Sequence, residues 1–337
     1  MIKKLHFICA LAAAAIACSC SGNKAQAEAK ADAAAADSLP VVYYIKEITP
    51  ENLQRIYHAL GRKAEGENVA VKISTGESGK SNQLAPALIA PFVHEVNGTL
   101  VECNTAYGGN RSTTEDHLRA AREHGYMDIA RVDIMDADGQ VKLPVDSGKH
   151  LKYDIVGKNL LNYDFLVVLS HFKGHAMGGF GGALKNVAIG IASSDGKAYI
   201  HTAGKVQTPD SLWHNLPEQD AFLESMAEAC KAVFNHMGDK VLFINVANRL
   251  SVDCDCNGAP AKPKMADLGI LASLDPVALD RACVDMVFNS SDPGKDDLIE
   301  RINSRHGTHI LDAAEELGLG SQKYRLVTLH DTGEKAK

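Results

Sequence analysis

The chain alternates short apolar runs with longer amphipathic segments from about residue 41 to residue 330. Several runs are continuous in Val, Ile, Leu and Phe, which is typical of strands covered on both faces of a sheet. The runs predicted to be strands are residues 69–74, 99–104, 165–170, 240–247, 268–273 and 324–330. The segments predicted to be helices are residues 51–60, 86–96, 114–124, 218–237, 276–288 and 310–317. This alternation predicts an α/β fold, a mostly parallel sheet with helices on both faces, in one domain or in two lobes.

The beginning of the chain does not follow this alternation. Two lysines precede an apolar run, residues 5–16, that is too short to cross a bilayer, and small residues lead up to Cys18. Residues 1–17 are therefore predicted to be a signal peptide. The junction resembles a bacterial lipoprotein lipobox, which implies that Cys18 is lipidated and begins the mature chain. Ala15 stands where a lipobox usually has leucine, so Cys20 as the lipid site and plain periplasmic release both remain open.

The segment after this junction is polar and rich in alanine. Residues 18–40 contain too few branched apolar side chains to offset the entropy of ordering them, which predicts a flexible tether. The folded domain is expected over residues 41–330, followed by a disordered tail over residues 331–337. We therefore expect an exported protein, periplasmic or anchored in the bacterial cell envelope, that contacts the membrane only through its lipid.

Composition narrows the class of partner. The chain has 337 residues, 45% of them hydrophobic, which is enough for a full-sized core. The formal net charge is −7, and the basic residues do not cluster into a stripe. Nucleic acid is therefore not expected as a partner, because the electrostatic footprint for it is missing. A small-molecule ligand is the partner that we expect.

The most informative segment follows the predicted strand at residues 165–170. It packs glycines, histidines and lysines into one connection, and another histidine lies shortly downstream. Glycine lets the backbone approach a ligand closely, while imidazole and amine groups supply proton transfer, metal ligation or covalent attachment. Ligands of such sheets bind at the carboxyl ends of strands, so we expect a cofactor or substrate site here. The residues predicted for it are His175, Gly178, Gly179, Gly181, Gly182, Lys185 and His201.

Four other residues are candidates for smaller roles. Glu77 and Arg111 lie in loops after predicted strands, where they could bind polar groups of a substrate or serve only as exposed loop residues. His171 and Lys173 are expected to flank the glycine-rich loop as surface residues. Only Glu77 and Arg111 therefore join the predicted site.

Familiar nucleotide and hydrolase motifs are absent. Residues 74–81 end in Gly-Lys-Ser, but Ser74 occupies the place of the first glycine of a phosphate-binding loop. Counted from Gly179, the dinucleotide fingerprint fails because Leu184 takes the place of its last glycine. The chain also has no Gly-x-Ser-x-Gly elbow and no His-Glu-x-x-His helix. These patterns disfavour a nucleotide P-loop, a nicotinamide fold and the simplest hydrolase or metalloprotease chemistry.

Cysteine usage suggests a second kind of chemistry. Cys254 and Cys256 form the one close pair in the predicted domain, with a single residue between them. Two thiolates at this spacing could ligate one soft metal or form a redox-active disulfide. The pair could also be two buried thiols of a loop, or part of a long-range disulfide. A ferredoxin Cys-x-x-Cys-x-x-Cys run is absent, so a classical 4Fe-4S cluster is not expected.

Three segments carry a resemblance to a known family: residues 173–186, 254–256 and 267–280. They resemble the DUF362 family, uncharacterised proteins often described as iron-sulfur centre proteins, and the resemblance extends from about residue 43 to residue 324. Many members have a ferredoxin-like cysteine insert where this chain has residues 202–217, which contain no cysteine. The resemblance therefore implies the family fold without implying an iron-sulfur cluster.

A more distant resemblance is to lactate racemases, which use a nickel-pincer nucleotide. The spacing of His175, Lys185 and His201, ten and then sixteen residues, is similar to theirs. This resemblance implies that Lys185 tethers the cofactor, His201 ligates the metal and His175 transfers protons. Asn110, beside Arg111, stands where that family has its second catalytic histidine. An amide does not exchange protons near neutral pH, so lactate racemisation by two bases is not expected, whereas one-sided hydride or proton chemistry is retained.

Three hypotheses follow. The leading one is an envelope-anchored, cofactor- or metal-dependent enzyme, an oxidoreductase or an isomerase, that performs redox or proton-transfer chemistry on a small organic acid. A metal ion or a tethered pincer-type nucleotide is the cofactor that it would use. The second is a thiol-based electron carrier or metal binder centred on Cys254 and Cys256. The third is a non-catalytic lipoprotein that binds a small anion.

Overall fold

The computed structural model describes residues 38–79 and 82–330. The predicted signal peptide, the lipidated cysteine, most of the tether and the tail lie outside the described residues. Within them, no helix combines the length and the apolar character needed to cross a membrane.

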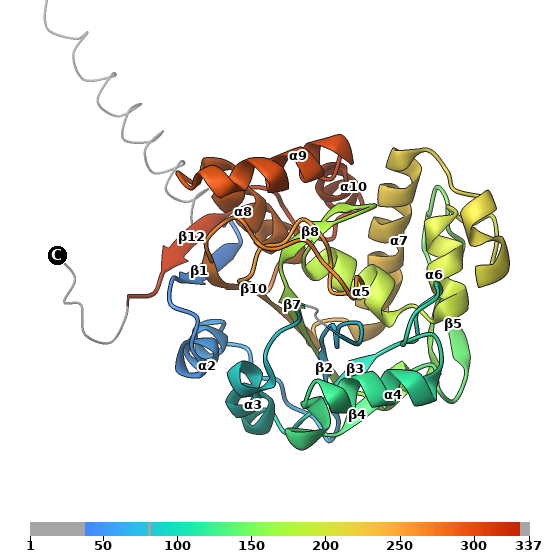
Figure 1. Cartoon of the computed structure of the whole chain (residues 1–337), viewed down its shortest axis with the longest axis horizontal. Coiled ribbons are helices and arrows are strands. Elements are labelled where there is room, and N and C mark those ends of the chain that lie inside the picture. Colours follow the sequence, from blue (N-terminus) through green and yellow to red (C-terminus); the bar gives the residue numbers. More distant parts are fainter. Residues whose placement is uncertain (1–37, 80–81, 331–337) are drawn as a thin grey trace, which may run out of the picture. The chain divides into compact units, whose positions relative to one another are not determined.

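Eight strands form one sheet in the order β12-β1-β11-β10-β7-β2-β3-β4 (Figure 1). Their bounds are β1 Val41–Ile45, β2 Val69–Lys72, β3 Gly98–Glu102, β4 Val132–Ile134, β7 Phe165–His171, β10 Val241–Ala247, β11 Gly269–Ser273 and β12 Arg325–Thr328. Neighbouring strands are parallel except that β11 runs antiparallel to both β10 and β1. The predicted α/β fold with a mostly parallel sheet is confirmed, and each of the predicted strands is present.

Two short hairpins lie beside this sheet. Strand β5, Gln140–Pro144, pairs with β6, Tyr153–Gly157. Strand β8, Lys173–His175, pairs with β9, Gly179–Gly181, so the glycine-rich loop is itself a hairpin. None of these strands was predicted, because each is too short to show a hydrophobic pattern of its own.

The helices occupy the predicted segments and several others. The α-helices are α2 Pro50–Ala59, α3 Pro86–Glu95, α4 Thr114–Glu123, α5 Ala183–Ile191, α6 Ser194–His201, α7 Gln219–Met237, α8 Pro276–Asn289, α9 Asp296–Ser304 and α10 His309–Glu316. Short 3-10 turns are η1 Tyr126–Asp128, η2 Lys158–Asn162, η3 Pro209–His214 and η4 Pro293–Lys295. Helix α5 escaped prediction because it is buried on nearly every side and so lacks a polar stripe.

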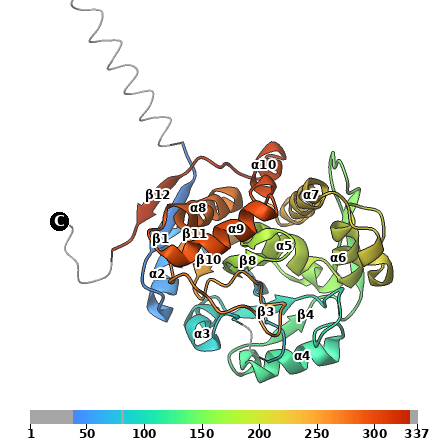
Figure 2. The ribbon, with the colours of Figure 1, turned by 45° about the horizontal axis from the view of Figure 1, so that its top comes forward.

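A hydrophobic core fills each face of the sheet. Along β7, Leu166 and Val168 join the core that contains α5, α7 and α8, whereas Val167 and Leu169 join the core that contains α2 and α3. This alternation follows from the two-residue period of a strand. The helices of the first core gather together in both views, away from α2 and α3 (Figure 1, Figure 2). The expected coverage of both faces is therefore confirmed.

The start of α5 is fixed by a carboxylate from another helix. Asp280, in the middle of α8, accepts hydrogen bonds from the backbone N–H groups of Ala183 and Leu184 at 2.7 and 2.9 Å. A Cβ atom at Gly182 would lie only 2.2 Å from Asp280 Oδ1, so glycine is required there. The Asp280 carboxylate therefore places Lys185, one turn into α5, relative to the carboxyl ends of β7 and β10.

Candidate functional site

A cavity lies where the segments after β2, β3 and β7 meet α5 and α6. Its volume is about 30 Å³, which has room for about two water molecules. Three cysteines, Cys103, Cys254 and Cys256, and several charged side chains form its wall. The charged residues are Glu102, Arg111, Lys173, Lys185, Lys197 and Asp255.

Cations outnumber carboxylates around this cavity. Glu102 pairs with Lys72 at 3.6 Å and with Arg111 at 3.3 Å. Lys197 donates to backbone carbonyls, with its Nζ 2.6 Å from the oxygen of Ala192. These pairings leave positive charge without a matching carboxylate, which favours an anion in the cavity.

Lys185 is the cation with the fewest contacts. Its side chain is half-buried, and in the described part of the chain its amine has neither a hydrogen-bond nor an ion-pair partner. Burial, followed by the positive charges of Lys173, Lys72 and Arg111, lowers its pKa to about 7. A large share of the amine is therefore neutral near neutral pH, when its lone pair can attack a carbonyl or acyl carbon.

His201, at the end of α6, presents a neutral ring. Its Nδ1 lies 2.7 Å from the carbonyl oxygen of Lys197, so Nδ1 carries the hydrogen. Burial is the main reason that its pKa is lowered to about 4. The ring stacks on Phe222, and Tyr107 of the cavity wall packs against its edge. This arrangement leaves the Nε2 lone pair without a partner among the described residues, as in histidines that ligate metals.

His175, in the β8–β9 hairpin, is held in the opposite tautomer. Its Nδ1 accepts hydrogen bonds from the backbone N–H groups of Gly178 at 2.8 Å and Met177 at 3.3 Å. Burial, together with the charges of Lys185 and His201, holds its pKa well below the usual range. His175 is therefore neutral and offers an Nε2–H donor, and it would act as a base only after giving up its backbone donors.

The predicted glycines serve packing within the protein. Gly179 has a φ of +80°, and a Cβ atom there would meet Gly307 Cα at 2.8 Å. A Cβ at Gly178 would meet His175 Nδ1 at 3.3 Å, and Gly182 is pressed against Asp280. The glycine on the cavity wall is instead Gly190, near the end of α5. Gly178, Gly179, Gly181 and Gly182 thus shape the hairpin that holds His175, and their assignment to a cofactor remains a prediction.

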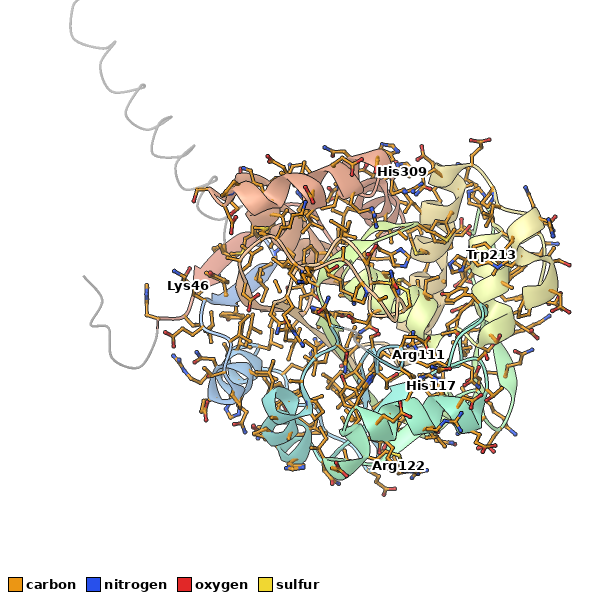
Figure 3. All side chains as sticks on the ribbon, viewed as in Figure 1. Lys46, Arg111, His117, Arg122, Trp213 and His309 are labelled. Carbon is orange, nitrogen blue, oxygen red and sulfur yellow. A yellow bond between two sulfur atoms is a disulfide. The ribbon has the colours of Figure 1, made fainter. Side chains whose placement is uncertain are left out.

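The loop before α4 brings Glu77 and Arg111 together. Glu77 Oε1 accepts a hydrogen bond of 2.6 Å from the backbone N–H of Asn110, and its Oε2 lies 3.6 Å from Arg111 Nε. Arg111 is buried, and its Nε has no hydrogen-bond partner among residues 38–79 and 82–330. Arg111 and His117 lie close together above α4 in Figure 3, and both contact Glu102. The Asn110 side chain is exposed, so of this loop Arg111 is the residue that reaches the cavity.

Cys254 and Cys256 form a disulfide on the cavity wall. Asp255, between them, is buried, with its carboxylate 3.0 Å from His171 Nδ1 and 2.7 Å from Lys173 Nζ. Burial alone would raise the pKa of Asp255, but His171 and Lys173 hold it well below the usual range. The expectation that His171 and Lys173 are surface residues was wrong, because the carboxylate of Asp255, far away in the sequence, neutralises them inside the protein.

Sequence reasoning missed several charged residues of the site. Lys72 ends β2, Glu102 ends β3, and both are buried. Burial would raise the pKa of Glu102, but Lys72, Arg111 and His117 hold it well below its usual range. Lys197, on α6, was also missed. The signal that could have found Lys72 and Glu102 is a charged residue closing a strand that is otherwise buried.

Fold and site together define an α/β protein with a cation-rich cavity at the carboxyl ends of its parallel strands. The sequence model of the family described as "Domain of unknown function (DUF362)" matches residues 69–285, and the chain belongs to this family. The resemblance expected from the sequence is confirmed. No curated protein matches the chain.

Two solved structures are similar to it at low identity. The lactate racemase apoprotein from Thermoanaerobacterium thermosaccharolyticum is 12% identical with a TM-score of 0.42, over 74% of this chain and 57% of that chain. A structural-genomics protein from Thermotoga maritima is 15% identical with a TM-score of 0.40, over 70% of this chain and 57% of that chain. The alignments thus span 57% of the length of each of these structures.

Proposed function

We propose that this protein is a cofactor- or metal-dependent enzyme that performs redox or proton-transfer chemistry on a small organic acid in the cation-rich cavity. The observation that carries the proposal is the amine of Lys185, which lies among several cations without a partner in the described part of the chain and has a pKa of about 7. A buried amine kept partly neutral by its neighbours is typical of a residue that forms a covalent bond.

We expect an organic acid as the substrate because the cavity wall carries several cationic side chains. A carboxylate in the cavity would meet Lys185 and Arg111, whose Nε is buried without a hydrogen-bond partner. Charge-assisted hydrogen bonds from these groups would be stronger than those from neutral donors. Entry of a carboxylate would also reduce the repulsion between the cations.

A tethered pincer-type nucleotide is consistent with the donor set. Lys185 offers a neutral amine for the tether, and His201 offers the Nε2 lone pair for the metal. When bound, such a group supplies a metal centre that can accept a hydride. The cavity, about 30 Å³ and partly open to solvent, is far smaller than a nucleotide, so loading would require the surrounding loops to move apart.

Side chains of this protein would bind and orient the substrate. Arg111 and Lys173 of the cavity wall would orient the carboxylate of the substrate. His175 is not part of that wall, but a nitrogen of its ring lies within 4.8 Å of the Cys254 and Cys256 sulfurs, so it would offer its Nε2–H once the loops have moved apart. The side chain of Asn110 is exposed and is no proton carrier, which leaves the site without the second base that racemisation needs. The proposed chemistry is therefore one-sided.

The test is a native mass spectrum, with fragmentation, of the protein purified anaerobically from its own host. We expect a metal-containing adduct on Lys185 that disappears in Lys185→Ala. Lys205→Ala is the matched control, because Lys205 is an exposed lysine outside the cavity. An unmodified mass for the wild-type protein would contradict a tether. Ligand-dependent melting without turnover would then favour a non-catalytic protein that binds a small anion.

A second candidate function rests on the disulfide of the cavity wall. An external dithiol would donate two electrons and two protons, opening the Cys254–Cys256 bond to two thiols and becoming a disulfide itself. We expect two alkylatable cysteines to appear together on reduction and to be absent from the Cys254→Ser/Cys256→Ser double variant. A disulfide that resists dithiols under native conditions would eliminate a thiol-based electron carrier.

We also propose that the chain is exported and anchored in the cell envelope through Cys18. The support is the sequence pattern of residues 1–17 and the small residues before that cysteine. Expression in the native host should place wild-type protein in the membrane fraction with a lipid on Cys18, and Cys18→Ser in the soluble fraction. Loss of the lipid in Cys20→Ser instead would move the lipid site to Cys20. If wild-type protein and both variants were divided equally between the membrane and soluble fractions, the lipid anchor would be refuted.

A further inference from the structure

A group of side chains that could ligate a metal lies away from the cavity, between the start of α7 and the turn that joins α9 to α10. It consists of Asp220, His306 and His309, which each offer a ligand atom within 4.8 Å of the other two. His309 lies near the top of α7 in Figure 3. Neither the family nor the proposed function assigns a role to these residues.

The contacts within the group are polar. His306 Nδ1 lies 2.6 Å from Asp220 Oδ1, and His309 Nε2 lies 3.3 Å from Glu224 Oε1. Glu224 is one turn after Asp220 and so presents its carboxylate on the same face of α7. The two imidazole rings are stacked, with centroids 5.1 Å apart and planes 13° apart. Two imidazoles and the carboxylate of Asp220 thus lie around one point, whereas the Glu224 carboxylate is also bound by Lys149, at 2.7 Å, and by His150.

We propose that this group is a binding site for one Zn²⁺-class divalent cation, with His306, His309 and Asp220 as ligands and water in the remaining position. Neutral imidazoles and carboxylates are the donor set of such sites. Metal–ligand bonds of about 2.0–2.2 Å require tetrahedral donors about 3.3–3.6 Å apart. The ligand atoms now lie within 4.8 Å of one another, so some of these distances must shorten when a metal binds. The side chains of His306 and Asp220 are 58% and 50% exposed, so they are free to rotate about their χ angles and bring the ligand atoms to these separations.

The same residues also form ion pairs without a metal, but exposed pairs of this kind are screened by water and contribute little to stability. Two stacked imidazole rings beside one carboxylate are the geometric feature that favours a metal here.

A cation here would brace the hairpin that holds His175. Gly307, beside His306, packs so tightly on that hairpin that a Cβ atom would meet the oxygen of Gly178 at 2.9 Å. Gln219, beside Asp220, donates hydrogen bonds of 2.8 Å to the carbonyls of both Met177 and Arg305. The proposed metal would tie these two supporting segments together behind the glycine-rich hairpin.

The test is a Zn²⁺ titration of the full chain by calorimetry, without reductant, so that the disulfide stays closed and its thiolates do not compete. The double variant His306→Gln/His309→Gln is compared with the control His58→Gln, which alters another exposed imidazole–carboxylate pair, between His58 and Glu95. We expect wild type and control to bind one Zn²⁺, and the double variant to bind it at least about tenfold more weakly.

Two further measurements make the result specific. Zn²⁺ should raise the melting midpoint of wild-type protein and control but not that of the double variant. Hydrogen exchange of the hairpin amides around His175 should slow with Zn²⁺ in the same two proteins. Equal Zn²⁺ binding by the double variant would overturn the proposal, as would a Co²⁺ complex with thiolate charge-transfer absorption, because it would place the metal on cysteines.

Discussion

At the scale of single residues, the main feature of the site is that cations outnumber carboxylates around the cavity. Glu102 is shared by Lys72 and Arg111, and the carboxylate of Asp255 is occupied by Lys173 and His171. Among the described residues, Lys185 has no carboxylate partner, and the neighbouring cations disfavour the protonated form of its amine. The same imbalance that disfavours the charged amine makes it a nucleophile and makes the cavity attractive to an anion.

The first prediction concerns the reactivity of Lys185 with pH. Its pKa is lowered from the ordinary 10.5 to about 7, so the neutral amine accumulates as the pH rises through about 7 rather than through 10.5. Labelling of Lys185 by a small carbonyl compound and borohydride should therefore rise about tenfold between pH 6 and 8 and level off above. Peptide mass spectrometry measures the extent of labelling at each pH.

Lys205 is the internal control for this profile, since it is exposed and lies outside the cavity. A Lys185 profile that follows that of Lys205 would mean that the cavity cations do not act on Lys185 as argued.

At the scale of elements, the glycine-rich hairpin and the start of α5 depend on support from distant segments. Asp280 accepts hydrogen bonds from the first N–H groups of α5 and one of 2.7 Å from the amide of Asn245. Asp275 instead caps its own helix, α8, by accepting from the N–H of Ala278. Asp275 therefore stabilises the start of α8, whereas Asp280 stabilises the start of α5.

The second prediction compares these two aspartates. Asp280→Ala would leave two backbone N–H groups and one side-chain amide buried without an acceptor, so the free energy of unfolding should fall by about 3 kcal/mol or more. Asp275→Ala removes a more exposed helix cap and should lower it by about 1 kcal/mol. Urea denaturation followed by circular dichroism measures both losses.

Asp280→Asn refines the comparison, because an amide keeps one acceptor oxygen and should recover part of the stability. If Asp275→Ala cost as much as Asp280→Ala, the special role of Asp280 in placing α5 would be refuted.

These elements also show how far the sequence predicts the molecule. Local periodicity predicted six strands of the main sheet and six helices in their order, but β1, β4, α6 and α9 were missed. Helix α5 and the β8–β9 hairpin were also missed, since α5 lacks a polar stripe and the hairpin packs against Gly307, which is distant in sequence. His175, Lys185, His201 and Arg111 were chosen by residue type and resemblance. The burial of His171 and Lys173 was missed because it depends on Asp255, a partner that no local pattern identifies.

At the scale of the whole molecule, the cavity joins segments that are far apart in the chain. Its wall combines residues after β2 and β3, two helices that follow β7, and the disulfide-bearing loop between β10 and β11. The parallel order of β10, β7, β2 and β3 brings the carboxyl ends of these strands to one edge. A ligand in the cavity would contact all of these segments, so its binding should stabilise the folded chain as a unit.

The last prediction follows from this arrangement. Oxalate, a small dianion, should raise the melting midpoint of the full chain, because its charge offsets the repulsion among the cavity cations. At 100 times its dissociation constant it would contribute about 2.7 kcal/mol, a shift of about 5 °C or more for a domain of this size. Lys185→Met removes one of the cations and should show a markedly smaller shift, whereas Lys205→Met should behave like the wild type. Chloride at matched ionic strength separates site binding from general screening. The same shift with chloride, or an undiminished shift in Lys185→Met, would show that the cavity is not an anion site, because a real site must depend on both the shape of the anion and the charge of Lys185.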